Sequence, residues 1–185
     1  MIYIIDHKDS LTHNVVHQFE NFDDVTCDNY NEINESKLKK SKVIVFSPGP
    51  GAPKDYPISS NIYKRFKGKK KIIGICLGFQ QILYCEKGKI IKQKKIFHGY
   101  QSKIKVTGEN SLFKKNRKFN VGRYHSLKLK EPFFAKNFEI TMRCAISNIA
   151  MAIENNYEKI YGFQFHPESF LTENGNLLIK KILSA

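Results

Sequence analysis

The sequence predicts an α/β fold, with an open, mostly parallel sheet, helices on both faces and a mainly antiparallel strand region in the second half. In the first half of the chain, short apolar strand patterns alternate with helical patterns, as in parallel strands joined by crossover helices. From about residue 89 to 165 the pattern changes to consecutive strands, and an amphipathic helix follows. No repeat or low-complexity linker divides the 185 residues, so we expect a single domain over 1–185.

The individual elements follow from the spacing of apolar residues. Continuous or alternating apolar runs predict strands at 2–5, 25–29, 43–46, 72–75, 102–106, 138–144, 149–153 and 160–165. Apolar residues at helical spacing predict helices at 11–19, 36–40, 58–66, 80–86 and 173–183. In open α/β sheets the ligand crevice lies beyond the carboxyl ends of the strands, which is where we expect a site.

Composition and cysteine spacing indicate which classes of protein this chain does not belong to. A chain of 185 residues can bury a substantial core without disulfides or metals. Its four cysteines show no CxxC or Cys/His metal spacing, which indicates a reduced, cytoplasmic protein without a metal site. The N-terminus reaches Asp6 too early for a signal peptide, and no apolar run approaches the length of a transmembrane helix.

The formal charge of +14 raises the possibility of a nucleic-acid-binding protein. Of the 31 basic residues only four are Arg, the residue that base readout and bidentate phosphate contacts favour. The lysine-rich runs at 67–71 and 92–95 are therefore interpreted as solvated surface. Electrostatic steering of an anionic substrate or an acidic partner surface remains open.

Cys76 marks a candidate catalytic site. It lies in Gly-Ile-Cys-Leu-Gly-Phe-Gln (74–80), between a predicted buried strand and a predicted helix. A sharp turn there lifts the side chain clear of the backbone, beside free N–H groups that stabilise a thiolate and an oxyanion. A cysteine after an apolar strand is more often a small buried hydrophobic residue, but the glycines on both sides indicate a need for unusual backbone freedom.

A second segment supplies the groups that a thiol nucleophile needs. Residues 162–169 read Gly-Phe-Gln-Phe-His-Pro-Glu-Ser, which places His166 at the end of a strand and Glu168 two residues later. Alone, His-Pro-Glu is more often a turn. Together with Cys76 it provides a nucleophile, its acid/base and a carboxylate that orients the base.

Four separated motifs resemble the class I, triad-type glutamine amidotransferases, in the order of that family and over essentially the whole chain. They are the oxyanion loop (47–53, Ser-Pro-Gly-Pro-Gly-Ala-Pro), the nucleophile elbow (74–80), a substrate-binding strand (122–127, Gly-Arg-Tyr-His-Ser-Leu) and the 162–169 segment. The resemblance implies the family's flavodoxin-like fold. It also implies a Cys76, His166 and Glu168 triad that hydrolyses L-glutamine and passes on ammonia.

The same resemblance assigns the remaining roles. The backbone N–H groups of Gly51 and Leu77 would form the oxyanion hole. Without the resemblance, 48–51 would be a rigid surface turn and Gln80 an ordinary helix residue. The residues expected to bind glutamine are Gly49, Pro50, Gly51, Gln80, Ser126 and Leu127.

The oxyanion loop, the 122–127 motif and residues 5–12 resemble the small subunits that feed chorismate-using synthases. This implies the glutaminase subunit of an anthranilate synthase or of an aminodeoxychorismate synthase, or one subunit serving both. The expected partner is the large synthase subunit, in a heteromer, with no synthase fused to this chain. The Pro-Gly-Pro-Gly loop and residues 172–175 favour anthranilate. The resemblance implies no cofactor here, because a Mg²⁺ requirement would belong to the partner.

Some positions depart from the family pattern, although every triad position matches. Residues 6–12 contain His7 and Leu11 where Asn and Phe are usual, Phe79 replaces a usual His, and Lys87 stands where a Gly is common. Two alternatives remain: a free-standing γ-glutamyl hydrolase and a catalytically silent binding module. The 122–127 motif argues against the first, and the intact triad argues against the second.

Overall fold

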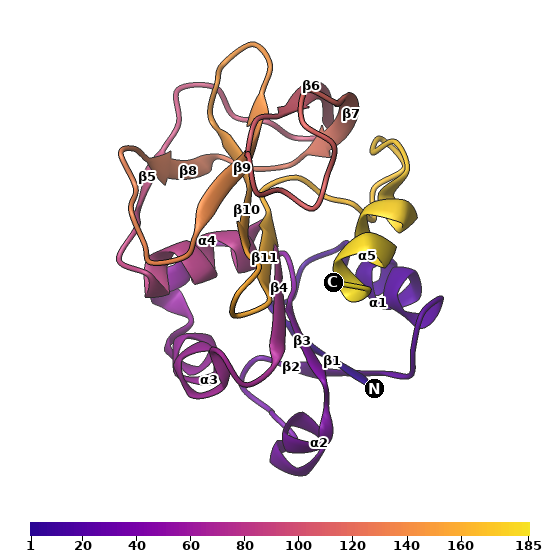
Figure 1. Ribbon diagram of the computed structural model, residues 1–185. Helices are drawn as coiled ribbons and strands as arrows, with labels where there is room; N and C mark the ends of the chain where they lie inside the picture. Colours follow the sequence, from indigo (N-terminus) through magenta and orange to yellow (C-terminus); the bar gives the residue numbers. More distant parts are fainter.

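The computed structural model describes all 185 residues and is built around a nine-stranded sheet with the order β2-β1-β3-β4-β11-β10-β9-β6-β7. The parallel half contains β2 (Val25–Asn29), β1 (Ile2–Asp6), β3 (Val43–Phe46), β4 (Lys71–Ile75) and β11 (Ile160–Phe163). The antiparallel half contains β10 (Ala150–Asn155), β9 (Glu139–Cys144), β6 (Tyr100–Val106) and β7 (Lys118–Arg123). The predicted fold class is confirmed, and Figure 1 shows how the two halves join.

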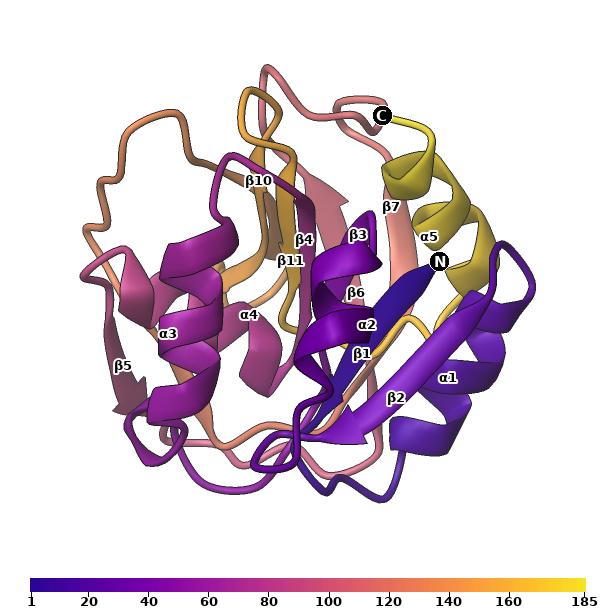
Figure 2. The ribbon, with the colours of Figure 1, turned by 90° about the horizontal axis from the view of Figure 1, so that it is seen from below.

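Helices cover both faces of the parallel half. They are α1 (Thr12–Glu20), α2 (Glu35–Lys40), α3 (Pro57–Phe66), α4 (Leu77–Cys85) and α5 (Gly175–Leu183), with a short 3₁₀ helix, η1 (Pro53–Asp55). In Figure 2, α1 and α5 lie on one side of the sheet and α3 and α4 on the other. The core is divided accordingly, since Phe19 and Ile179 belong to one buried cluster and Tyr63 and Ile82 to the other. None of these helices combines the length and apolar character needed to cross a bilayer.

The central strands lie between two layers of helices, so apolar residues are required on both of their faces. Residues 72–75 of β4 are all buried, as the continuous apolar run predicts. Beside β4 runs β11 in parallel, with Phe163 opposite Ile75. Because parallel neighbours end at the same edge of a sheet, the segments that carry Cys76 and His166 leave it side by side.

Several elements differ in extent from the sequence prediction, and three of the differences lie next to the site. Helix α4 begins at Leu77 rather than at Gln80, because burial of its first turn outweighs the low helix propensity of Gly78. Strand β11 ends at Phe163 rather than at residue 165. Residues 122–127 are not one strand, since β7 ends at Arg123 and the next strand begins at Leu127.

That next strand, β8 (Leu127–Lys130), belongs to a separate two-stranded sheet with β5 (Lys89–Lys92). β5 (Lys-Ile-Ile-Lys) shows no alternation, and β8 (Leu-Lys-Leu-Lys) alternates over only four residues, so the sequence did not predict them individually. The small sheet matters for the site because it carries Leu127.

The 67–71 run is not simply solvated, which corrects the interpretation from the sequence. Lys67 bonds Glu86 at 2.6 Å, and Lys70 donates to the backbone carbonyls of residues 39 and 41. Lys71 donates to the carbonyls of Ile182 and of residue 183, each at 2.7 Å. Because the last carbonyls of a helix lack partners within it, Lys71 caps α5. These lysines hold elements together.

Candidate active site

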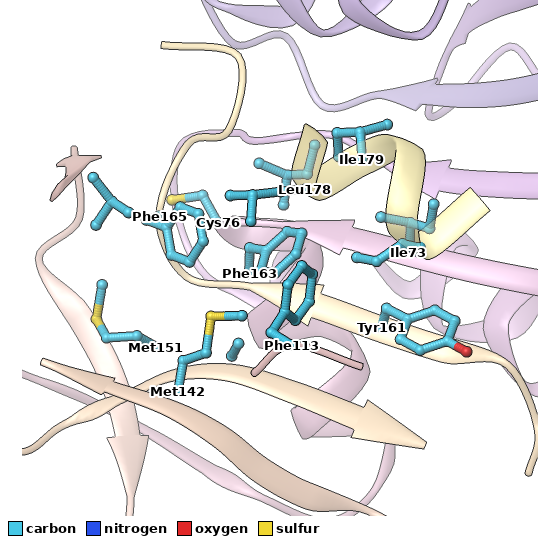
Figure 3. Packing of buried hydrophobic residues seen from close by; sticks show 14 of the residues in the cluster. Ile73, Cys76, Phe113, Met142, Met151, Tyr161, Phe163, Phe165, Leu178 and Ile179 are labelled. Carbon is cyan, nitrogen blue, oxygen red and sulfur yellow. The ribbon is translucent and has the colours of Figure 1, made fainter. Parts of the chain in front are cut away.

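Cys76 occupies the turn between β4 and α4 in a strained conformation, with φ 52° and ψ −99°. Its backbone N–H donates to the carbonyl of Phe163 on the neighbouring strand at 2.7 Å, which holds the turn against the sheet. Cys76 belongs to the buried cluster drawn in Figure 3, together with Phe163 and Phe165, and is 7% exposed. An ordinary core cysteine needs no positive φ, so the strain indicates a functional turn.

The glycines beside Cys76 are required for space rather than for backbone freedom, which corrects the argument from the sequence. Neither has a positive φ. A Cβ on Gly78 would lie 2.1 Å from the carbonyl oxygen of Phe46, and one on Gly74 would lie 2.4 Å from that of Gly78. Both distances are far below van der Waals contact. The start of α4 therefore packs directly on the backbone of β3 and β4.

His166 is held near the end of β11 by backbone contacts with a neighbouring segment. Its N–H donates to the carbonyl of Gly122 at 3.1 Å, and its carbonyl accepts from the Thr172 hydroxyl at 2.6 Å. The Tyr124 ring lies edge-on to the imidazole, with 4.8 Å between centroids. The imidazole is thus confined on a segment that leaves the sheet next to Cys76.

Glu168 orients the imidazole. The Nδ1–H of His166 donates to Glu168 Oε1 at 2.6 Å, and both side chains are almost fully buried. Burial alone would lower the pKa of His166, but the charges of Glu168 and Cys76 raise it well above its ordinary value. Nε2 has no hydrogen-bond partner. The raised pKa favours the protonated ring, which Glu168 stabilises.

The oxyanion loop lies against the start of α4. A Cβ on Gly49 would lie 2.6 Å from Leu77 Cδ2, so only glycine permits this contact. Gly51 has φ 75°, in the region that favours glycine. The N–H groups of Leu77 and Gly51 make no hydrogen bond within the chain. Both predicted donors are thus free, and the loop packs beside the residue that follows Cys76.

His7, one of the departures from the family pattern, contacts the oxyanion loop and helps to hold it in place. It is fully buried, its Nδ1–H donates to the carbonyl of Ser47 at 3.1 Å, and Ser59 donates to its Nε2 at 2.9 Å. Burial lowers its pKa to about 4. Tyr56, whose ring lies edge-on to His7, donates to the carbonyl of Pro50 at 2.8 Å. A neutral histidine therefore occupies this position as a structural group.

Phe79 and Leu11, two further departures, make no hydrogen bond to the triad residues, and the third, Lys87, takes the positive φ of 67° that a glycine would favour. Phe79, in the first turn of α4, is fully buried in the core cluster on that side of the sheet. A Cβ on Gly162 would lie 3.0 Å from its ring. Leu11 precedes α1, and its N–H donates to Asp9 at 2.8 Å. Both residues are accommodated by packing or local hydrogen bonds.

The residues expected to bind glutamine converge only in part. Gln80 and Leu127 come together, because Gln80 Nε2 donates to the carbonyl of Leu127 at 3.4 Å. Ser126 is exposed in the turn between the two sheets. His125 shapes that turn by donating from Nδ1 to the carbonyl of Leu127 at 2.8 Å. Burial and then the charge of Arg123 lower the pKa of His125 to about 3, so it stays neutral.

Gln164 is a contact of Cys76 that the sequence did not reveal to us. It is fully buried, and its Nε2 lies 3.8 Å from Cys76 Sγ. The signal was available, because residues two apart in an extended segment point the same way and Gln164 precedes His166 by two.

One surface cavity adjoins this region, and a larger one lies elsewhere. One of about 610 Å³ lies between residues 52–54 of the oxyanion segment, β5 and Leu127. A larger one, of about 920 Å³, is lined by Ile2, Val43 and Lys71 at the opposite ends of the strands and has no link to the triad. No group of three or more His, Cys, Asp or Glu side chains is arranged to hold a metal ion.

Comparison with known proteins agrees with this geometry. The family model "Glutamine amidotransferase class-I" matches residues 3–185. Anthranilate synthase component 2 of Lactococcus lactis is 38% identical, covering 100% of this chain and 94% of that protein. The corresponding protein of Porphyra purpurea is 37% identical, covering 100% of both. Bifunctional protein TrpGD of Thermotoga maritima is 36% identical over 99% of this chain, which spans 32% of that protein.

Solved structures agree on the fold. A putative GMP synthase protein from Thermoplasma acidophilum superimposes with a TM-score of 0.84 at 20% identity, covering 99% of this chain and 92% of that one. PurLQS from Thermotoga maritima gives a TM-score of 0.75 at 17% identity, covering 99% and 96%. Given a family match over nearly the whole length and full-length relatives more than one-third identical, the chain belongs to the class-I glutamine amidotransferases.

Proposed function

We propose that this chain is the glutaminase component of an anthranilate synthase, releasing ammonia from glutamine at Cys76 and delivering it to a chorismate-using synthase subunit. The observation that carries the proposal is the strained, buried Cys76 beside a histidine that Glu168 orients at 2.6 Å. Full-length relatives named anthranilate synthase component 2 support the assignment to this synthase. The four free cysteines are consistent with a cytoplasmic location.

The first step is attack on the carboxamide of glutamine. The Cys76 thiolate adds to the carbonyl carbon while the proton stays on His166. The oxyanion that forms accepts from the N–H groups of Leu77 and Gly51, which have no other partner. Loss of one such donor raises the barrier by roughly 3–4 kcal/mol, so the loop contributes directly to the rate.

The intermediate then collapses. The C–N bond breaks, His166 Nε2 gives its proton to the departing nitrogen, and ammonia leaves a glutamyl thioester on Cys76. A water molecule, deprotonated by His166, attacks the thioester carbonyl and releases glutamate and the thiolate. Glu168 holds the ring in the tautomer that both transfers require.

Glutamine is recognised at the junction of α4 and the small sheet. Gln80 and the backbone of Ser126 and Leu127 bind the substrate, and Gly49, Pro50 and Gly51 cover its carboxamide. The contact of Gln80 with the Leu127 carbonyl supports this position. Ammonia must pass directly to the partner, because in bulk water it becomes ammonium, which is not a nucleophile.

The test is reconstitution with a synthase large subunit. We expect Cys76→Ser to abolish anthranilate formation from glutamine while leaving formation from ammonium salts intact, since only ammonia is transferred. Cys85→Ser, which alters a thiol at the end of the same helix, is the matched control and should retain both activities.

Equal loss of both activities in Cys76→Ser would contradict the glutaminase assignment. A parallel reconstitution with the large subunit of an aminodeoxychorismate synthase tests the choice of synthase. If glutamine-dependent product formed only with that second partner, the chain would be assigned to aminodeoxychorismate synthase instead.

A further inference from the structure

Gln164 lies where the chain leaves β11, between the strand and His166. Its side chain is fully buried, and its backbone N–H donates to the carbonyl of Met151 at 2.9 Å. A buried amide costs free energy unless its donors and acceptor are used, so the partners of its side chain define its role.

The orientation of the Gln164 amide can be traced to the carbonyl of Leu127, which can only accept a hydrogen bond. The Leu127 carbonyl can only accept, so Gln80 must turn Nε2 toward it, at 3.4 Å. The same nitrogen donates to Gln164 Oε1 at 3.0 Å. Gln164 therefore presents its oxygen to Gln80 and its nitrogen to Cys76 Sγ, at 3.8 Å. The chain of contacts determines which end of the amide faces the sulfur.

We propose that Gln164 is a further residue of the catalytic site, whose carboxamide stabilises the Cys76 thiolate and couples it to the pocket formed by Gln80 and Leu127. The inference builds on the proposed glutaminase function. Cys76 is only 7% exposed, so water is a poor substitute for a lost donor. Hydrogen bonds to an ionised acceptor are stronger than neutral ones and favour the charged form.

The neutral amide of Gln164 provides a hydrogen-bond donor that remains in place throughout the reaction, which His166 cannot do. His166 gives its proton to the departing ammonia, whereas Gln164 does not titrate and keeps its N–H on the sulfur. In thioester hydrolysis the C–S bond breaks and its electron pair returns to the sulfur. A donor held at Sγ favours that departure, so Gln164 assists both halves of the reaction.

The experiment measures alkylation of Cys76 by iodoacetamide in the isolated chain, as a function of pH, with the site identified by mass spectrometry. Gln164→Met keeps the size and removes the donors. We expect the pH of half-maximal rate to rise by about one unit, equivalent to roughly tenfold less thiolate at neutral pH. Gln164→Glu adds a negative charge and should shift the profile further. His166 beside the sulfur, Glu168 bonded to His166, and His125, which interacts with the charge of His166, are unchanged in each variant.

Gln18→Met is the matched control. Gln18 is another buried glutamine whose Nε2 donates to a carbonyl, that of Pro167 at 2.9 Å, but it does not touch the sulfur. We expect a lower melting temperature and an unchanged pH profile. If Gln164 were merely structural, Gln164→Met would behave in the same way, and that result would overturn the proposal.

Gln80→Met keeps the test decisive if Gln164→Met does not fold. It leaves Gln164 in place but removes the bond that orients its amide, so an intermediate shift is expected. An unshifted profile in both Gln80→Met and Gln164→Glu would also overturn the proposal. Preferential alkylation of another cysteine in the unaltered chain would instead contradict the proposed function, because this assay involves neither glutamine nor a synthase.

Discussion

At the scale of single residues, the candidate site contains a strained conformation that lowers the stability of the fold. Cys76 has a positive φ, which costs a residue with a Cβ about 1–3 kcal/mol. The turn is held by the Cys76 N–H bond to Phe163 and by close packing of Gly78 on β3. The strain is therefore offset by the strands and the helix on either side.

His7 makes stability depend on pH. Burial lowers its folded-state pKa to about 4, below the ordinary value of 6.5. The unfolded chain thus takes up the proton first, and this contribution to stability is lost as the pH falls from 6.5 toward 4. The shift corresponds to about 3 kcal/mol at most. His125, whose pKa is about 3, acts with the same sign.

We therefore predict that His7→Asn lowers stability at pH 8 but reduces its loss on acidification. The hydrogen bond from Ser59 and some packing disappear, while the group that must be protonated on unfolding is gone. Urea unfolding at pH 8, 6 and 4.5 measures both effects. His17→Asn is the control, because that side chain is 85% exposed and should leave the pH dependence unchanged. An identical acid slope in His7→Asn and the unaltered chain would contradict the assignment.

At the scale of elements, the contact between α4 and β3 determines where the nucleophile lies. A Cβ on Gly78 would approach the Phe46 carbonyl to 2.1 Å, and backbone cannot move aside as a flexible side chain does. We predict that Gly78→Ala displaces the start of α4, destabilises the fold by about 1–3 kcal/mol and slows alkylation of Cys76. Chemical denaturation and iodoacetamide labelling measure the two effects.

Gly99→Ala separates steric overlap from backbone strain. Gly99 also has a positive φ, of 77°, but a Cβ there would meet only Tyr124, at 3.7 Å. We expect a cost of about 1 kcal/mol from strain and unchanged labelling of Cys76. If Gly78→Ala were no more damaging than Gly99→Ala, the close packing of α4 would not be what positions the nucleophile.

At the scale of the whole molecule, Cys76 is nearly buried in the isolated chain. Cys76 is 7% exposed, and the oxyanion loop packs on Leu77 through Gly49. We therefore expect movement of this loop to control how a substrate carbonyl approaches the sulfur. Docking of a synthase subunit is a natural trigger, because an uncoupled glutaminase would waste glutamine.

We predict weak glutaminase activity in the isolated chain and a rise of roughly tenfold or more when the synthase partner is added. Gly51→Ala should suppress the activated rate while costing about 1 kcal/mol of stability from strain, because its φ is 75°. The added Cβ would lie 2.8 Å from the carboxylate of exposed Asp55, which can turn aside only by giving up its hydrogen bond from the Ala52 N–H. Steady-state assays with and without the partner decide the matter. Full activity in the isolated chain, unchanged by a verified partner, would show a preassembled site.

The sequence by itself determined the parallel half of the fold and its chemistry. Apolar runs such as 72–75 are continuous because strands covered on both faces must be apolar throughout, and the alternation with helical patterns then requires parallel pairing. The Cys76 elbow and the His166 segment could be found because each is local and each follows a recognisable strand.

Only the tertiary structure decided the rest, because it depends on contacts between distant segments. The glycines around Cys76 are needed where α4 meets Phe46, about thirty residues earlier in the chain, and no local pattern shows that contact. Lys71 caps a helix more than a hundred residues away. The amide chain from Leu127 through Gln80 and Gln164 to Cys76 joins three segments that become neighbours only after β4, β11 and the small sheet have assembled.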